Sequence, residues 1–156
     1  MPKKWLPSWP ENLPRTLVFP EKTLPEFLSD HARQTPEKVA FNFYGREISF
    51  REFDQRTNQL AMALMDFGLK KGDRVSLFLE NSPQFVIGYF AILKAGGVVV
   101  AANPMFKEDE LKYELMDAGA RIIIAQDFLY PKVRNVREEA ELSHVILTSY
   151  RDTLPD

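Results

Sequence analysis

The most regular feature of the chain is a set of four short apolar runs that alternate with segments of helical periodicity. The runs occupy residues 74–79, 97–101, 121–125 and 144–148 and are rich in valine, isoleucine and leucine. Near-continuous apolar runs of this length are typical of strands that are covered on both faces. Strands that alternate with helices are joined by right-handed crossovers into a parallel sheet. The pattern therefore predicts an α/β fold with a doubly wound, mainly parallel sheet.

Three helices are expected between these strands. Ser82 and Pro83 are typical of a helix start, and the helix that follows them is apolar nearly all round, so we expect it to be the most buried. The second helix spans residues 108–117, with Glu108 placed to pair with Lys112 one turn later. The inward positions of the second and third helices are apolar: Leu111, Leu115, Leu129, Val133, Val136 and Ala140.

The segment before the sheet begins with a short amphipathic helix and a hairpin. Thr23 and Glu26 have the spacing of a capping box, and Pro36 ends the helical pattern that follows. Apolar residues then alternate over residues 39–50 with an interruption at Gly45, which predicts two antiparallel strands joined by a tight turn. The hairpin therefore precedes the sheet.

A second helix is predicted directly after the hairpin. Ser49 and Glu52 form another candidate capping box, and the inward face of the helix recurs at helical spacing: Phe53, Thr57, Leu60, Ala61 and Leu64. Residues 68–73 read Gly-Leu-Lys-Lys-Gly-Asp and resemble a phosphate cradle only superficially. We expect the two glycines to end the helix and to turn the chain into the next strand, and we expect Lys70 and Lys71 to be solvated.

Residues 1–22 hold both tryptophans and a high share of the prolines. Proline disfavours the interiors of helices and strands, so this segment is expected to be an extended arm. Trp5 and Trp9 need a surface to lie on. Two alternatives stay open: the arm packs across its own domain, or it packs on another subunit or on another domain of a longer chain.

Composition narrows the classes of function. The 156 residues are 45% hydrophobic, and 20 Lys plus Arg are interspersed with 22 Asp plus Glu, so no basic field suited to nucleic acid is present. The absence of cysteine excludes disulfides, thiolate metal sites and a cysteine nucleophile in these residues. No apolar run has the length of a signal-peptide core or of a membrane span, so we expect a soluble, cytoplasmic protein, with peripheral membrane association left open.

Polar residues at the predicted strand ends are the candidates for a functional site. Ligands of open α/β sheets usually sit beyond the carboxyl ends of the strands. The residues at these positions are Glu80 and Asn81, Ala102 and Asn103, Gln126 and Asp127, and Thr148 and Ser149. Each also has a structural explanation in a cap, a turn or a loop. We therefore assign no catalytic residue, and the cofactor-binding residues are unknown.

Other kinds of site are not supported by the spacing of residues. The two histidines fit no Ser-His-acid combination, and no His or carboxylate spacing predicts a metal site. His31 lies on the apolar face of the first helix and is expected to be a packed or edge histidine and not a metal ligand. The apolar stripe over residues 85–93 is expected to be core, with the border of an acyl pocket as the alternative.

An ordered set of motifs resembles the adenylate-forming (AMP-binding) superfamily of acyl-CoA synthetases, peptide-synthetase adenylation domains and luciferases. Residues 48–53, Ile-Ser-Phe-Arg-Glu-Phe, resemble its first conserved core, and residues 93–104, Leu-Lys-Ala-Gly-Gly-Val-Val-Val-Ala-Ala-Asn-Pro, resemble its second. The resemblance covers about residues 24–150. The Trp-Pro arm, Asn103 with Pro104, and residues 144–148 are most similar to long-chain fatty-acid–CoA ligases.

The resemblance implies the fold and chemistry of that family. Residues 23–156 would form a partial N-terminal α/β domain of an enzyme that joins a fatty acid to CoA through an acyl-adenylate, with ATP, Mg²⁺ and CoA as cofactors. The family's Gly/Ser/Thr-rich phosphate loop, its C-terminal domain and its catalytic lysine have no counterparts here. We therefore expect these residues alone to be inactive and to bind none of the three cofactors.

The expected partners are the fatty acid of the parent enzyme and the remainder of the ligase chain, and a homo-oligomer stays open. Two alternatives are retained. The chain is either a self-contained α/β binding or regulatory module built on the same scaffold, or a fragment of another adenylate-forming enzyme. The second alternative includes aryl-CoA ligases and peptide-synthetase adenylation domains.

Overall fold

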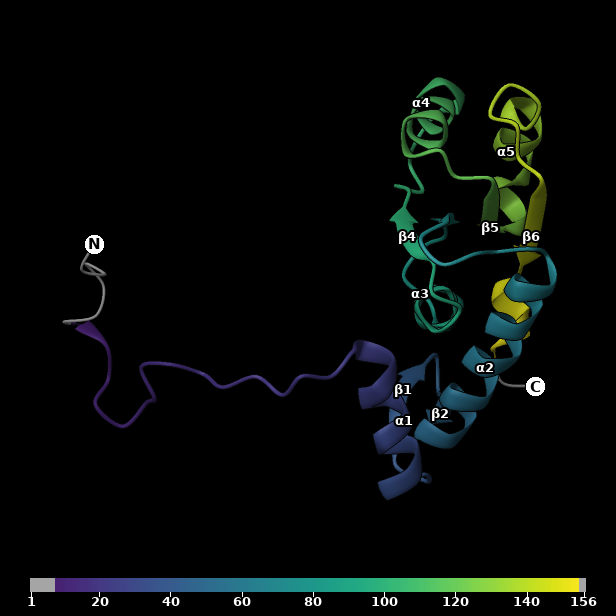
Figure 1. Ribbon diagram of the computed structural model, residues 1–156. Coiled ribbons are helices and arrows are strands. Elements are labelled where there is room, and N and C mark those ends of the chain that lie inside the picture. The colour runs from purple at the N-terminus through teal and green to yellow at the C-terminus, as the bar shows by residue number, and fades with distance from the viewer. Residues whose placement is uncertain (1–7, 155–156) are drawn as a thin grey trace.

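The computed structural model describes residues 8–154 and contains a four-stranded parallel sheet (Figure 1). Its strands are β3 (Arg74–Phe78), β4 (Val98–Ala101), β5 (Ile122–Gln126) and β6 (His144–Thr148). They lie in the order β4-β3-β5-β6, and each neighbouring pair is parallel. The predicted α/β fold and parallel sheet are confirmed, with strand ends that differ from the prediction by one residue at most.

Helices cover the sheet on both faces. On one face lie α2 (Phe50–Asp66) and α3 (Pro83–Lys94), and on the other lie α4 (Glu108–Ala118) and α5 (Tyr130–Val136) (Figure 1). The alternation of side chains along a strand produces this arrangement. In β5, Ile122 and Ile124 pack with α2 and α3, whereas Ile123 and Ala125 pack with α4 and α5. The layer is doubly wound, as predicted, and α3 has six buried residues, more than any other described helix.

The two outer strands are less covered than their apolar composition predicts. All residues of β5 are buried, but Val98 in β4 is 47% exposed and Leu147 in β6 is 45% exposed. The expectation that all four strands are covered on both faces is therefore correct for β3 and β5 and wrong for β4 and β6. The reason is their position, because within residues 8–154 each of them has a neighbouring strand on one edge only.

The segment before the sheet has the predicted elements. Helix α1 (Leu24–Gln34) starts with the full capping box between Thr23 and Glu26. The strands β1 (Val39–Phe43) and β2 (Arg46–Ser49) are antiparallel. The turn between them places Tyr44 and Gly45 at φ angles of 49° and 87°, the left-handed conformations that a tight hairpin turn requires. Helix α2 follows β2 without a connecting loop.

Three charged residues of α2 and α4 have partners that differ from the predicted ones. Ser49 caps α2 by accepting from the backbone N–H of Glu52, but the Glu52 carboxylate pairs with Arg46 and Arg56 and does not complete the capping box. The predicted pair between Glu108 and Lys112 is absent. Lys112 instead pairs with Glu139 at 2.9 Å, and Glu108 accepts from Asn135 at 2.8 Å. Both α4 side chains reach across to the segment that contains α5, and Lys112 also lies 4.0 Å from Asp109 of its own helix.

The last helix is shorter than the inward pattern predicts. A 3₁₀ turn (Asp127–Leu129) precedes α5, and α5 ends at Val136. Leu129, Val133, Val136 and Ala140 are all buried as predicted, but Ala140 lies in a turn after the helix. The apolar pattern therefore identified the core residues correctly and overestimated the length of the helix.

A buried ion pair joins α1, α2 and α3. The Lys94 ammonium lies 2.7 Å from an Asp54 carboxylate oxygen and donates to Thr57 and Asn58 at 2.8 and 2.7 Å. Ser29 of α1 donates to the same carboxylate at 3.1 Å. The Lys94 and Asp54 side chains are only 10% and 20% exposed, so the interaction lies largely inside the three-helix contact.

The described part of the arm, residues 8–22, extends away from the rest of the molecule (Figure 1). Leu17, Val18 and Phe19 are 63%, 95% and 75% exposed, and the indole N–H of Trp9 donates to the backbone oxygen of Leu13 at 3.3 Å. The alternative in which the arm packs across its own domain is wrong for these residues. Trp5 lies outside the described residues.

Candidate functional site

An open groove lies at the carboxyl ends of β3 and β4. Its volume is about 1000 Å³. The residues that line it come from the two strand ends, the start of α3, the hairpin tip and the segment after β6: Phe43, Tyr44, Leu79, Glu80, Asn81, Phe85, Ala101, Ala102, Asn103, Pro104, Tyr150 and Leu154. This is the position at which an open α/β sheet offers a ligand site.

Two of the four predicted pairs line the groove, and two do not. Glu80 with Asn81 and Ala102 with Asn103 are brought together because β3 and β4 are neighbours in the sheet. Gln126 is fully buried, and both polar atoms of its side chain lack a hydrogen-bond partner among the described residues. Asp127 accepts from the adjacent backbone N–H of Phe128 and does not cap the 3₁₀ turn.

The fourth pair stabilises the end of the chain segment after β6. The hydroxyl of Thr148 and the backbone N–H of Ser149 both donate to the Asp152 carboxylate, each at 2.8 Å. These bonds hold a 3₁₀ turn (Tyr150–Asp152) beside the groove. Thr148 and Ser149 therefore position the wall of the groove and do not form it.

Tyr150 is the most connected side chain of the groove, and the sequence analysis did not single it out. Its hydroxyl donates to the Glu80 carboxylate, and its ring stacks on Phe43 with centroids 6.0 Å apart. The Phe128 ring lies beside the Tyr150 ring, with centroids 6.2 Å apart. Burial, followed by the hydrogen bond to Glu80, raises the pKa of Tyr150 to about 12, because a phenolate would be poorly solvated and repelled by the carboxylate. Tyr150 is therefore held as a neutral donor.

Two further contacts fix the groove walls. The side chain of Gln84, at the start of α3, donates to the backbone oxygen of Ser149 at 2.6 Å. Outside the lining residues, the Lys132 ammonium donates to the backbone oxygen of Phe106 at 2.6 Å and to that of Pro104, which lines the groove, at 3.4 Å. These contacts connect segments that are distant in sequence, so a search of local motifs does not reveal them.

The hairpin tip was also missed as a contributor to the groove. Phe43 and Tyr44 reach the groove because the turn at Gly45 carries them to the end of the sheet, where Phe43 meets Tyr150. The available signal was the pair of aromatic residues before a turn glycine, since aromatic residues at a tight turn have no core of their own to fill. The partner that explains them lies more than one hundred residues later.

The chemistry of the groove is that of a binding surface. Its lining combines aromatic and aliphatic side chains with two amides, two phenols and the Glu80 carboxylate, and it contains no lysine or arginine. Phosphate groups are bound by basic side chains or by cradles of backbone N–H groups, so these residues do not fit the triphosphate of ATP. Within residues 8–154, no group of three or more His, Cys, Asp or Glu side chains is placed to hold a metal ion.

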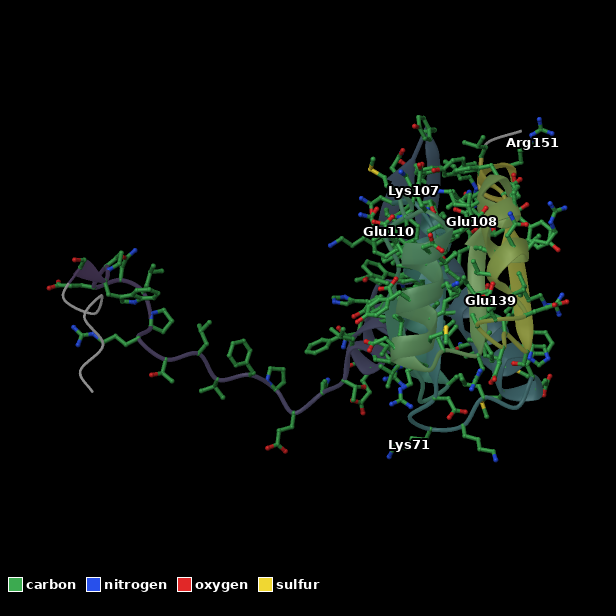
Figure 2. All side chains as sticks on the ribbon, turned by 90° about the horizontal axis from the view of Figure 1, so that it is seen from above. Lys71, Lys107, Glu108, Glu110, Glu139 and Arg151 are labelled. Carbon is green, nitrogen blue, oxygen red and sulfur yellow. The ribbon has the colours of Figure 1, made fainter. Side chains whose placement is uncertain are left out.

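The glycine-lysine loop lies at the other end of the sheet. Figure 2 shows Lys71 at one end of the molecule and Lys107 and Arg151 at the opposite end, where the strands finish. The backbone N–H of Lys70 donates to the Asp73 carboxylate at 2.8 Å, and that of Gly72 donates to Gly96 at 2.9 Å. The loop is a turn into β3, as predicted, and is not part of the groove.

His31 is exposed, which fits the expected edge position and not full packing, and the apolar stripe of α3 is mostly core. The His31 ring stacks on Phe50 with centroids 4.9 Å apart. In the stripe, Ile87, Ala91 and Ile92 are buried, and only Phe85 contributes to the groove lining. Among the helices within residues 8–154, none combines the length and the apolar composition that crossing a membrane would need.

Comparison with known proteins gives relatives over nearly the whole chain. The long-chain-fatty-acid–CoA ligase of Bacillus subtilis is 41% identical over 153 residues, which is 98% of this chain and 27% of that protein. The enzyme of the same name from Escherichia coli O157:H7 is 33% identical over 157 residues, 99% of this chain and 28% of that protein. Bacitracin synthase 3 of Bacillus licheniformis is 37% identical over 107 residues, 69% of this chain and 2% of that protein. The chain spans about a quarter of the length of the ligases it matches.

Solved structures share the fold. The anthranilate CoA ligase AuaEII in complex with anthranoyl-AMP matches 82% of this chain and 26% of its own, with a TM-score of 0.77 and 28% identity. A long-chain-fatty-acid-CoA ligase from Archaeoglobus fulgidus matches 88% of this chain and 30% of its own, with a TM-score of 0.78 and 24% identity. The sequence profile of the AMP-binding enzymes matches residues 28–156. The chain is a member of the AMP-binding enzyme family.

Proposed function

We propose that these residues supply the N-terminal α/β scaffold of a long-chain fatty-acid–CoA ligase. The whole enzyme would convert ATP, a fatty acid and CoA into acyl-CoA, AMP and pyrophosphate through an acyl-adenylate. The observation that carries the proposal is the 41% identity to a ligase of that name over 98% of the chain. The absence of cysteine is compatible with a reducing cytoplasm, where we place the enzyme.

The proposed role is structural support for a reaction that other parts of the enzyme perform. The groove has no basic side chain for phosphate, and the 156 residues contain no Gly/Ser/Thr-rich loop, so ATP, Mg²⁺ and CoA would be held mainly by other segments. A scaffold contributes by holding reactive groups in place, which can account for several kcal/mol of a catalytic barrier, on the order of 7–11 kcal/mol in the best cases. We infer that residues 1–156 alone do not activate a fatty acid.

A chimeric enzyme tests the scaffold role. This chain would replace the matching 153-residue part of the Bacillus subtilis ligase. We expect the chimera to catalyse palmitate-dependent exchange of pyrophosphate into ATP. A matched chimera that carries the aligned part of bacitracin synthase 3 serves as the control and should be less active. A chimera that folds, as judged by circular dichroism and gel filtration, yet lacks palmitate-dependent exchange would contradict the proposal.

A second candidate is another adenylate-forming enzyme with an aromatic acid substrate. It is favoured by the similarity to the anthranilate CoA ligase, whose 28% identity exceeds the 24% of the fatty-acid ligase structure described above. The full natural enzyme that contains this chain would distinguish the two, by comparing exchange with palmitate and with anthranilate. Preference for anthranilate would favour the second candidate.

A further inference from the structure

The outer edge of β4 lacks the features that usually protect an exposed strand. In the described sheet β4 pairs only with β3, and its sequence is Val-Val-Val-Ala, without charge, proline or bulge. Natural edge strands commonly carry lysine, proline or bulges that prevent pairing with another strand. Val98 is 47% exposed, and Ala101 is exposed as well. The strand therefore has the composition of an interior strand at an edge position.

The hydrogen bonds to β3 identify which backbone groups face outward. The N–H of Val98 donates to Asp73 at 2.8 Å, and the N–H of Ala102 donates to Leu77 at 3.0 Å. Alternate residues of a parallel strand direct their backbone groups to the same neighbour. Because residues 98 and 102 face β3, the N–H groups of Val99 and Ala101 face the open edge. They are available to a further strand.

The flank of α4 on the same side of the molecule is apolar and acidic. Figure 1 shows α4 on the side of β4, and Figure 2 shows Glu110 on the side of α4 away from Glu139. A groove of about 490 Å³ follows this flank and is lined by Phe106, Asp109, Glu110, Tyr113, Glu114 and Asp117. Tyr113 is 71% exposed. The surface thus offers apolar area beside several carboxylates.

Within the described chain, Glu114 is the residue of this flank whose carboxylate has an unsatisfied buried oxygen. One of its carboxylate oxygens is buried and has no hydrogen-bond partner among residues 8–154. Burial raises the pKa of Glu114, with no basic side chain to offset it. A carboxylate oxygen that is buried without a partner is unfavourable, and a basic side chain brought to the flank would offset that cost.

We propose that β4 and this flank of α4 form a docking surface for another segment of an AMP-binding enzyme chain. That segment adds a strand to the edge of β4 and places a basic side chain against Glu114. The inference rests on the proposed function, because the ligases that this chain matches are several times longer than the chain itself. Strand addition is a common mode of recognition, in which backbone hydrogen bonds supply much of the affinity.

A second copy of this chain is the competing occupant, and the charge of the flank disfavours it. A symmetric pair joined through β4 would bring the same surface of both copies together. Glu110, Glu114 and Asp117 of the two flanks would then approach one another, and like charges at an interface are repulsive. A segment with a basic side chain meets no such repulsion.

Hydrogen exchange at single-residue resolution tests the docking surface. It would be measured on residues 1–156 and on the chimera with the Bacillus subtilis ligase. We expect the amide hydrogens of Val99 and Ala101 to exchange at least about tenfold more slowly in the chimera, because they gain hydrogen bonds there. In the chimera, Glu114→Arg should reverse much of this protection, whereas Glu138→Arg, on an exposed turn after α5, should not.

The outcomes separate this inference from the proposed function. Equal exchange of Val99 and Ala101 in both proteins, in a chimera that activates palmitate, would overturn the docking surface and leave the function standing. Protection without fatty-acid activation would support the docking surface and count against the function. Protection in the isolated chain that grows with protein concentration would show that a second copy occupies the edge, which also overturns the inference. If Glu114→Arg fails to fold, Glu114→Gln should still weaken the protection.

Discussion

At the scale of single residues, Lys94 of α3 connects that helix to α2, and through Asp54 to α1. Its ammonium pairs with the Asp54 carboxylate, and the Lys94 and Asp54 side chains are only 10% and 20% exposed. The Asp54 carboxylate also accepts a hydrogen bond from Ser29. In the sequence Lys94 stood out only as part of the motif of residues 93–104, because its partners lie on another helix. Capping of α1 by Thr23 was predictable, because both members of the capping box are local in sequence.

Substitution of Lys94 should be strongly destabilising. Lys94→Met leaves the Asp54 carboxylate largely buried without its cation, and we expect the free energy of unfolding to fall by about 3 kcal/mol. Lys71→Met is the matched control on an exposed turn and should change it by less than about 0.5 kcal/mol. Urea unfolding, monitored by circular dichroism, measures the free energy of unfolding of both variants. Equal stability of the two variants would show that the buried pair is not important for packing.

Tyr150 should make stability depend on alkaline pH. Its pKa is raised to about 12 in the folded chain, above the ordinary value of 10, so the folded state favours the neutral phenol. The resulting stabilisation is complete below about pH 10 and is lost as the pH rises towards 12. We expect the wild-type chain to lose more stability than Tyr150→Phe over this interval, measured by urea unfolding at a series of pH values. Parallel pH curves for the two proteins would refute the hydrogen-bonded role of Tyr150.

At the scale of elements, the apolar pattern predicted each helix and strand, because burial on one face or two leaves a strong periodic signal. The ion-pair partners of charged side chains were less predictable. Lys112 pairs with Glu139 and not with the predicted Glu108. The Glu52 carboxylate pairs with Arg46 and with Arg56 one helical turn later instead of completing the capping box. The residues of the groove were likewise only partly predictable from sequence. The strand ends of β3 and β4 were identified, whereas Tyr150 required knowledge of tertiary contacts.

Gly88 allows α3 to approach β3 closely, which can be tested by substitution. A Cβ at this position would lie 2.9 Å from Cδ2 of Leu77, which is fully buried. Alanine favours a helix by about 1 kcal/mol over glycine, but overpacking costs about 1–3 kcal/mol, so Gly88→Ala should lower the free energy of unfolding by about 1 kcal/mol. Thermal or urea unfolding measures the change. If Gly88→Ala costs as much in a Leu77→Val background as in the wild type, the close approach is not its cause.

At the scale of the whole molecule, the described arm contributes little to the fold. Its apolar residues are exposed, and its tie to α1 is the ion pair between Lys22 and Asp30. Removal of residues 1–21 keeps this pair and should change the free energy of unfolding by less than about 0.5 kcal/mol. A larger loss in urea unfolding would mean that the arm packs on the domain. The sequence indicated an extended arm from its prolines, but could not indicate what the arm contacts.

The fold class and the family were accessible from sequence because the ordered motifs extend over most of the chain, whereas the proposed reaction would depend on segments that these residues do not contain. The alternative of a self-contained module makes a different prediction from a scaffold piece. A self-contained domain unfolds cooperatively as a monomer, whereas a scaffold piece exposes apolar surface such as the β4 edge and tends to associate. Analytical ultracentrifugation combined with urea unfolding of residues 1–156 distinguishes these behaviours.

The most direct test of the central claim is the formation of palmitoyl-AMP from ATP and palmitate, assayed side by side for residues 1–156 and for the chimera with the Bacillus subtilis ligase. The account predicts palmitoyl-AMP from the chimera and none above background from the isolated chain. Palmitoyl-AMP made by the isolated chain, or none made by a folded chimera, would contradict it.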